Sequence, residues 1–448
     1  MPRLSRCIPA LFLALFLLLG CSEVALASEG HVPVHTEGPA LFGIRLEFML
    51  FAVTLLGVAL FHHYSLWIAV GGFVVNLIYK LTAVSGWSAG HWIQEEYLLL
   101  LNLLGLLVGF ALLAKHFEES GVPQWLPDIL PDDWKGGAAL LAIVFVLSAF
   151  LDNIAAAMIG GEMARVLYKN RVHVGFLAAI VASANAGGAG SVLGDTTTTM
   201  MWIAGCSPLD VIEATIGSVA AIAFCGSLAS WQQHRFQPIT KDAPAGIKID
   251  WGRLVVVGLV LVGAISTNVL LDFPAAGVWG ALILGWALRK PDWHVVPDAA
   301  KGATFLLSLV LSASMMPVEA LPEPSWSTSL GLGFISSIFD NIPLTRLAIA
   351  QDHYDWGLLA YAVGFGGSMM WFGSSAGVAL STIFPQAKST GRWLRFGWHV
   401  IPAYVIGFFV MLTVLGGFHP HPIKRGAAED PAAHVGSGVA APASATPH

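Results

Sequence analysis

Long apolar blocks fill the chain from residue 45 to residue 418, and many are as long as a helix that crosses a bilayer. Such a helix needs about 20 mostly apolar residues. Only 11% of the residues are charged and the mean hydropathy is +0.72, whereas a soluble protein carries about 25% charged residues. The sequence therefore predicts an all-α polytopic membrane protein. A net charge of −6 without a basic patch gives no reason to expect nucleic acid as a partner.

The apolar segments fall into two corresponding halves. In the first half they lie near 45–62, 65–84 and 96–114, followed by a block at 136–168, a long segment at 173–203 and a last one at 208–231. In the second half they lie near 253–272, 274–289 and 302–318, followed by a block at 328–351, a long segment at 356–384 and a last one at 397–418. The shared order predicts an internal repeat.

The fourth block of each half contains the same motif. Residues 148–154 read SAFLDNI and residues 336–342 read SSIFDNI. A charge at the centre of a spanning helix costs about 2.5–3.5 kcal/mol, whereas Asp and Asn are favoured at helix N-termini, where they accept free backbone N–H groups. We therefore expect two re-entrant hairpins, with tips at Asp152-Asn153 and Asp340-Asn341, that face protein or water rather than lipid.

With the hairpins counted as non-crossing, each half crosses the membrane five times, so the second half is inverted relative to the first. The positive-inside rule tests this arrangement. With the mature N-terminus outside, the basic residues on the inner side are Lys115, Lys135, Arg165, Lys169, Arg171, Arg235, Lys241, Lys248, Arg253, Arg289, Lys290, Lys301, Lys388, Arg392 and Arg395. Those on or near the outer side are Arg45, Lys80, Arg346, Lys424 and Arg425. This charge bias supports two inverted-topology repeats. We expect a protein of the bacterial inner membrane whose mature N-terminus is periplasmic.

A glycine-rich stretch follows each Asp-Asn block. Residues 187–196 read GGAGSVLGDT and residues 366–375 read GGSMMWFGSS. Glycine costs about 1 kcal/mol in a helix interior, so both segments predict broken helices whose carbonyls and helix ends can face a bound ion. The glycines of this backbone are Gly187, Gly188, Gly194, Gly366, Gly367 and Gly373. Alternatively, they serve only to let helices pack closely.

The oxygen atoms of carboxylates, side-chain amides, hydroxyls and backbone carbonyls suit alkali cations as ligands. The candidate ion- and proton-binding residues are Asp152, Asn153, Asp340, Asn341, Asp195, Thr196, Ser374 and Ser375. A partly desolvated carboxyl group can hold either a proton or a cation, and this competition is sufficient for exchange of Na⁺ for H⁺ without a cofactor. Two alternatives stay open. Each Asp-Asn pair can be a structural cap alone, and Asp195, whose counterpart is Ser374, can be a ligand, a proton carrier or a helix cap.

The chain resembles the NhaD-type sodium/proton antiporters in three stretches, which read SAFLDNIAAAM, NAGGAGSVLGDTTTTMMWI and SSIFDNIPLT. These antiporters belong to the ion transporter superfamily, together with arsenite permeases and divalent-anion/sodium symporters. The resemblance spans about residues 45–418. It implies inverted repeats with hairpins that meet near the midplane, exchange of Na⁺ or Li⁺ for H⁺, a homodimer and an elevator-like motion. The superfamily's symporters have Ser-Asn-Thr at the hairpin tips, and the Asp-Asn-Ile found here argues against an anion as substrate.

The nearest alternative is a permease for a dicarboxylate or an arsenite-like metalloid in the same fold, because Arg346, near the second tip, leaves room for charge compensation. An aspartyl intramembrane protease needs a GxGD motif, and Val192-Leu193-Gly194-Asp195 lacks the first glycine. A primary pump needs a GxxxxGK[ST] phosphate-binding loop, and no such stretch occurs in the sequence. We therefore expect a secondary transporter and not an enzyme.

The ends of the chain predict segments outside the repeats. Residues 1–27 have the plan of a signal peptide that ends at Ala25-Leu26-Ala27, with a lipobox at Cys21 or an uncleaved helix as alternatives. Residues 28–44 are then a periplasmic segment, 45–231 the first repeat, 232–252 a cytoplasmic connector and 253–418 the second repeat. Residues 419–448, rich in Ala, Pro and His, predict a disordered tail.

Overall fold

The computed structural model describes residues 39–41, 44–61, 64–85, 87–126, 130–240 and 247–423. The predicted signal peptide, most of the segment 28–44, part of the connector and the tail from residue 424 onward lie outside the described residues. The described chain is almost entirely helical. It also has one small antiparallel pair of strands, β1 (Ala40–Leu41) and β2 (Ile44–Arg45).

Ten helices form the described part of the first half. They are α2 (Leu46–Leu60), α3 (Ser65–Ala83), α4 (Ala89–Glu118), α5 (Val122–Trp125), α6 (Trp134–Ser148), α7 (Asn153–Leu167), α8 (Val174–Ala189), α9 (Thr196–Ile203), α10 (Pro208–Ile212) and α11 (Ala214–Phe236).

The second half contains α-helices and short 3₁₀ helices. They are α12 (Trp251–Leu271), α13 (Pro274–Gly285), η3 (Trp293–Val295), α14 (Val296–Ser314), η4 (Val318–Ala320), α15 (Trp326–Ser336), α16 (Asn341–Gln351), α17 (Trp356–Gly366), η5 (Gly367–Met369), α18 (Ser375–Ile383), η6 (Pro385–Lys388), α19 (Thr390–Phe396) and α20 (Val400–Val414).

Five helical segments of the described chain are long and apolar enough to cross a membrane. They are Ser65–Ala83, Glu96–Glu118, Pro208–Phe236, Trp251–Leu271 and Trp293–Ser314, and the pair α19 and α20, bent by 57°, makes a sixth if it is one span. Shorter apolar helices, among them α6, α8, α13 and α17, pack with them. The prediction of an all-α polytopic membrane protein is therefore confirmed. The count of five crossings in each half stays a prediction.

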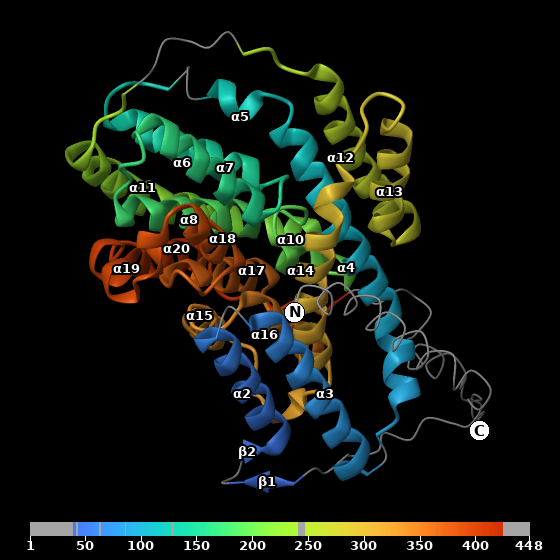
Figure 1. Cartoon of the computed structure of the whole chain (residues 1–448). Helices are drawn as coiled ribbons and strands as arrows, with labels where there is room; N and C mark the ends of the chain where they lie inside the picture. Colours follow the sequence, from blue (N-terminus) through green and yellow to red (C-terminus); the bar gives the residue numbers. More distant parts are fainter. Residues whose placement is uncertain are drawn as a thin grey trace, which may run out of the picture.

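The helices pack in two groups, which share an interface. The frame group consists of α2, α3, α4, α12, α13 and α14, which contact one another. The core group consists of α6 to α11 and α15 to α20, in which α8 packs against α6, α7, α11 and α17. Figure 1 shows α6, α7, α8 and α11 on one side of the molecule and α12 and α13 on the other, with the long helix α4 between them. The groups meet where α4 contacts α7 and α9 and where α14 contacts α16.

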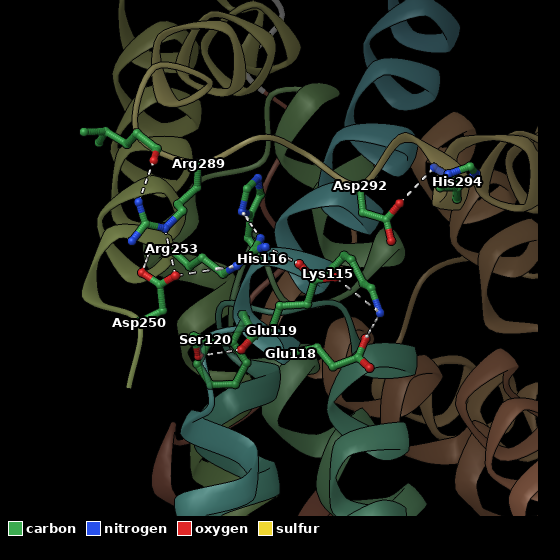
Figure 2. Close-up of polar contacts among 12 residues, drawn as sticks. Lys115, His116, Glu118, Glu119, Ser120, Asp250, Arg253, Arg289, Asp292 and His294 are labelled. Atoms are coloured by element: carbon green, nitrogen blue, oxygen red, sulfur yellow. Dashed lines mark hydrogen bonds and ion pairs between the residues drawn. The ribbon is translucent and has the colours of Figure 1, made fainter. Parts of the chain in front are cut away.

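A cluster of charged side chains joins the end of α4 to the start of α12 (Figure 2). Asp250 Oδ2 lies 2.8 Å from Arg289 Nε, and Arg253 Nη2 lies 2.6 Å from Glu119 Oε2. The backbone N–H of Asp250 also donates to the carbonyl of Ser120 at 2.8 Å. These contacts attach the end of the connector to the frame group at Asp250, the N-cap of α12.

The last described residues are held by hydrogen bonds. The backbone N–H of His419 donates to Asp355 Oδ2 at 3.0 Å and that of Ile423 to Asp352 Oδ1 at 2.9 Å. Trp356 Nε1 donates to the carbonyl of His421 at 2.8 Å. The hydrogen-bonded chain thus extends to Ile423, five residues into the segment for which the composition predicted a disordered tail.

Candidate functional site

Each Asp-Asn pair lies at a helix start inside the core group. Asp152 is the N-cap of α7 with φ −53° and ψ 144°, and Asp340 is the N-cap of α16 with φ −54° and ψ 142°. Neither side chain makes a capping hydrogen bond, although both residues occupy the capping position. Asp340 Oδ1 is buried without a hydrogen-bond partner among the described residues. The backbone therefore places both carboxylates at a helix start, and neither side chain makes a capping hydrogen bond there.

The two glycine-rich stretches interrupt helices at matching positions. α8 ends at Ala189 and α9 begins at Thr196, while α17 and η5 end at Met369 and α18 begins at Ser375. Asp195 accepts the backbone N–H of Thr197 at 3.3 Å, and Ser374 accepts that of Gly377 at 3.4 Å, so each caps the helix after its break. Capping, one of the three roles considered for Asp195, is thus present in the structure.

The same packing contacts recur in both halves. Ser148 Oγ donates to the carbonyl of Ala184, and Ser336 Oγ donates to that of Val363. A Cβ at Gly187 would lie 2.0 Å from the Phe145 carbonyl oxygen, and a Cβ at Gly366 would lie 2.3 Å from that of Gly333. Gly187 and Gly366 are thus needed for close backbone approach, and a bound ion at the breaks stays a prediction.

The tip of the second half contacts the broken helix of the first half. Asn341 Nδ2 donates to Asp195 Oδ2 at 3.2 Å, and both residues are about 3% exposed. α16 accordingly packs against α9. Four of the predicted site residues come together here, because the Ser375 hydroxyl also interacts with the Asp340 carboxylate, next to Asn341.

The tip of the first half reaches the broken helix of the second half through Asn185, which was not among the predicted site residues. Asn153 Nδ2 donates to Asn185 Oδ1 at 3.2 Å, and Asn185 Nδ2 lies 3.0 Å from both Ser374 Oγ and Ser368 Oγ. Asn185 is fully buried on α8. The signal that could have revealed it is a lone amide in a helix that is otherwise apolar, because a buried amide must find partners.

Asp195 is the carboxylate that links the two tips electrostatically. Both Asp152 and Asp340 interact electrostatically with Asp195. The helices α7, α9, α16 and α18 all begin here, and the positive ends of their dipoles partly compensate negative charge. A bound cation or bound protons would neutralise the remaining negative charge, since like charges close together in a desolvated site are unfavourable.

A cavity of about 20 Å³ lies beside Asp152 and Asp195, which is room for about one water molecule or one small ion. Its polar side is completed by Thr196 and Thr199. The opposite side is apolar and is formed by Leu103, Leu106, Leu107 and Phe110 of α4, with Leu193 at the edge. Asp340 does not line this cavity. It belongs to the neighbouring contact with Ser375.

No three His, Cys, Asp or Glu side chains among the described residues converge so that they could hold a metal ion by themselves. A bound alkali cation would therefore also use amide, hydroxyl and backbone oxygens. Asp152, Asp195 and Thr196 are the predicted residues that line the cavity, whereas Asn153 and Ser374 contact Asn185.

One charged contact crosses from the frame group to α16. Arg346 forms an ion pair with Glu96 of α4, and the side chains are 11% and 8% exposed. The sequence left room for Arg346 to compensate the charge of an anionic substrate. In the structure its guanidinium is instead engaged by a carboxylate of the protein.

Apolar spanning helices around a buried polar centre, with interrupted helices meeting there, define a multi-pass membrane transport protein. Residues 24–354 match the family described as citrate transporter (CitMHS), and the chain belongs to this family.

The relatives carry antiporter names. Sodium/proton antiporter 1 of Arabidopsis thaliana is 29% identical over 280 residues, covering 53% of this chain and 48% of the relative, so the match spans about half of that protein's length. Sodium/proton antiporter 2 of Arabidopsis thaliana is 27% identical over 75% of this chain and 90% of its own length. The Na(+)/H(+) antiporter NhaD of Vibrio parahaemolyticus is 25% identical over 61% of this chain and 79% of its own. The resemblance to NhaD-type antiporters is thereby confirmed.

Proposed function

We propose that this protein is a secondary antiporter that exchanges Na⁺ or Li⁺ for H⁺ across a bacterial inner membrane. The observation that carries the proposal is the placement of Asp152 and Asp340 at helix N-caps without capping hydrogen bonds, both beside Asp195. Half-buried carboxylates within apolar segments, without capping hydrogen bonds of their own, are costly to keep. Binding a cation or a proton in turn gives them a function.

The architecture we propose for this exchange is a pair of inverted repeats. In each, one helix pair (α6 with α7, and α15 with α16) is a re-entrant hairpin, and one (α8 with α9, and α17 with α18) is a broken crossing. The recurring contacts of Ser148 and Ser336 support the repeat. The charge bias of the sequence supports the inversion, with the mature N-terminus in the periplasm.

A cation fits the site better than an anion. Asp152, Asp195 and Asp340 would repel a dicarboxylate, and the nearby guanidinium of Arg346 is paired with Glu96. The alternative, a permease for an anion or metalloid, therefore lacks free positive charge at the described site. The names of the relatives point the same way.

The exchange cycle follows from competition for the same oxygens. On one side of the membrane, Na⁺ displaces protons from the carboxyl groups and is bound by carboxylate, amide and hydroxyl oxygens. The core group then moves against the frame group, and on the other side protons replace the ion. Because the protonated and Na⁺-loaded sites differ little in net charge, both can make the crossing, and the two fluxes are opposite. We expect a homodimer, with lipid and monovalent cations as the other partners.

Inside-out vesicles with an acidic interior and a fluorescent pH probe test the proposal. Addition of NaCl or LiCl should dissipate the pH gradient in wild type and fail to do so in Asp152→Asn and Asp340→Asn. The matched control is Asp298→Asn, whose carboxylate is exposed and pairs with Lys301. It should exchange like wild type. If wild type responds to no alkali cation but takes up citrate, succinate or arsenite, the antiport proposal is wrong and the permease alternative takes its place.

A further inference from the structure

Helix α4 presents one apolar stripe to the cavity. Leu103, Leu106, Leu107 and Phe110 follow the spacing i, i+3, i+4 and i+7, which places them on one helix face, and all four line the cavity opposite Asp152 and Asp195. Leu103 and Leu106 are each 1% exposed, so this face is closed off by protein. We call these four residues the apolar wall.

The wall and the carboxylates belong to different helix groups. α4 packs against α12, α13 and α14 of the frame group, whereas α7 and α9 pack against α8 and other helices of the core group. α4 also contacts α7 and α9 of the core group. Any motion of the core group against the frame group would therefore carry Asp152 and Asp195 along the apolar wall.

The energetic cost of facing the apolar wall depends on the charge of the site. Leu and Phe side chains offer a charged carboxylate no hydrogen bond in place of water, which makes this arrangement unfavourable. A carboxyl group that holds a proton, or a carboxylate that holds Na⁺, is largely neutralised and can face an apolar surface at much lower cost. The empty, deprotonated site is thus the state that the wall excludes from crossing.

We infer that the apolar wall enforces coupling, because it blocks the return of an empty site and makes each crossing require either Na⁺ or protons. This inference rests on the antiport proposed above and adds to it the residues that prevent leak. The side chains of these four residues carry no oxygen that could bind a transported ion, so they act on the crossing step and not on binding.

The experiment replaces wall residues by a polar residue of similar size. Leu107→Asn and Leu103→Asn are made, and Leu101→Asn is the matched control, since Leu101 lies on the same helix with 40% of its side chain exposed. Each purified full-length variant is reconstituted in liposomes loaded with radioactive sodium and a pH probe. Sodium efflux is measured at neutral and at alkaline external pH, where protons for the return step are scarce.

In wild type and Leu101→Asn, sodium efflux should fall with proton availability. In Leu107→Asn and Leu103→Asn, efflux at alkaline pH should exceed that of wild type by about tenfold, because a polar wall admits the empty charged site. The Na⁺ concentration for half-maximal rate should stay unchanged. Leu107 is only partly buried, so Leu107→Asn should perturb folding less than Leu103→Asn. Its efflux alone tests the inference if Leu103→Asn does not fold.

Two failures are distinguishable. If wild-type liposomes show no Na⁺-dependent proton movement, the proposed function is wrong. If wild type exchanges and the two wall variants are slower but keep the wild-type dependence on protons, or if Leu101→Asn leaks as much as they do, the apolar wall does not enforce coupling and only this inference is overturned.

Discussion

Asn341 Nδ2 donates a hydrogen bond to Asp195 Oδ2 at 3.2 Å, across 146 positions of the sequence. This contact links a helix start in the second half to the broken helix of the first half. Asp195 uses its other oxygen, Oδ1, to accept the backbone N–H of Thr197. One carboxylate thus both caps α9 and belongs to the cluster with Asp152 and Asp340.

The two roles of Asp195 can be separated by substitution. Asp195→Ser keeps a good capping group, as found at Ser374, but removes the charge, whereas Asp195→Ala removes both. Loss of the cap should cost about 0.5–2 kcal/mol, so Asp195→Ala should unfold at a lower temperature and Asp195→Ser near wild type. Both should lose Na⁺/H⁺ exchange in the vesicle assay. Wild-type exchange by Asp195→Ser would assign this residue to capping alone.

Asn185 should be needed for stability and for ion affinity. Asn185→Ala removes the partner of Asn153 and of two buried hydroxyls, and such orphaned groups cost about 1–3 kcal/mol. The free energy of unfolding should fall by that order, and the Na⁺ concentration for half-maximal exchange should rise. The measurements are thermal unfolding in detergent and the vesicle assay over a range of NaCl concentrations.

Ser183→Ala is the matched control for Asn185→Ala. Ser183 lies two residues away on α8 and is fully buried, but its Oγ has no hydrogen-bond partner among the described residues. Removing it should leave stability unchanged or raise it. Equal losses in the two variants would mean that the contacts of Asn185 contribute nothing beyond packing on α8.

The starts of α7 and α16 could be predicted from the sequence, because the cost of placing a carboxylate in an apolar segment does not depend on tertiary contacts. A carboxylate within an apolar block is costly wherever the block packs, so Asp152 and Asp340 had to lie at a break, and the structure places them at the first residues before α7 and α16. The span 65–84 was likewise close to α3, Ser65–Ala83, since the length of an apolar run bounds the helix that it forms.

The partners of these residues could not be predicted in the same way. Asn185 stands in a run of Ala and Gly that gives no hint of a partner 189 residues away. Glu96 lies near the start of an apolar run and gave no signal of its pairing with Arg346. The apolar wall is ordinary helix sequence until α4 is packed against α7 and α9. Each depends on tertiary contacts that no local pattern encodes.

Asp250 should stabilise the fold in a pH-dependent manner. The hydrogen bond from Arg289 holds the pKa of Asp250 below its ordinary value, which is about 3.9. A lowered pKa means that the stabilisation is present above the ordinary value and is lost as the pH falls through the folded-state value. Asp250→Asn should therefore unfold at a lower temperature than wild type at pH 7, and the difference should vanish in strong acid. Thermal unfolding across this pH range is the measurement.

Arg289→Gln is the companion variant for Asp250→Asn, since it removes the other member of the pair shown in Figure 2. Both side chains are exposed to solvent in part, so the effect should be small and should shrink in high salt. A pH-independent loss of stability in Asp250→Asn would instead point to its capping bonds to Gly252 and Arg253.

The ion pair between Glu96 and Arg346 should show strong coupling in a double-mutant cycle. Removing one partner of a buried pair leaves an uncompensated charge and costs about 3–5 kcal/mol, so Glu96→Gln and Arg346→Gln should each be strongly destabilised. The double variant Glu96→Gln/Arg346→Gln removes both charges and should recover most of the loss. The free energy of unfolding of the four proteins, from denaturant titration in detergent, gives the coupling energy.

The charge-reversed pair Glu96→Arg/Arg346→Glu is the stricter test, because it keeps an ion pair between α4 and α16 with its polarity inverted. If the pair serves only to join the frame group to the core group, this variant should be about as stable as the double-Gln protein or more so, and should retain Na⁺/H⁺ exchange. If instead the positive charge near Asp340 is itself required, exchange should be lost although the protein is folded. Additive effects of the single substitutions would contradict a direct interaction, since side chains in contact couple by about 0.5–3 kcal/mol.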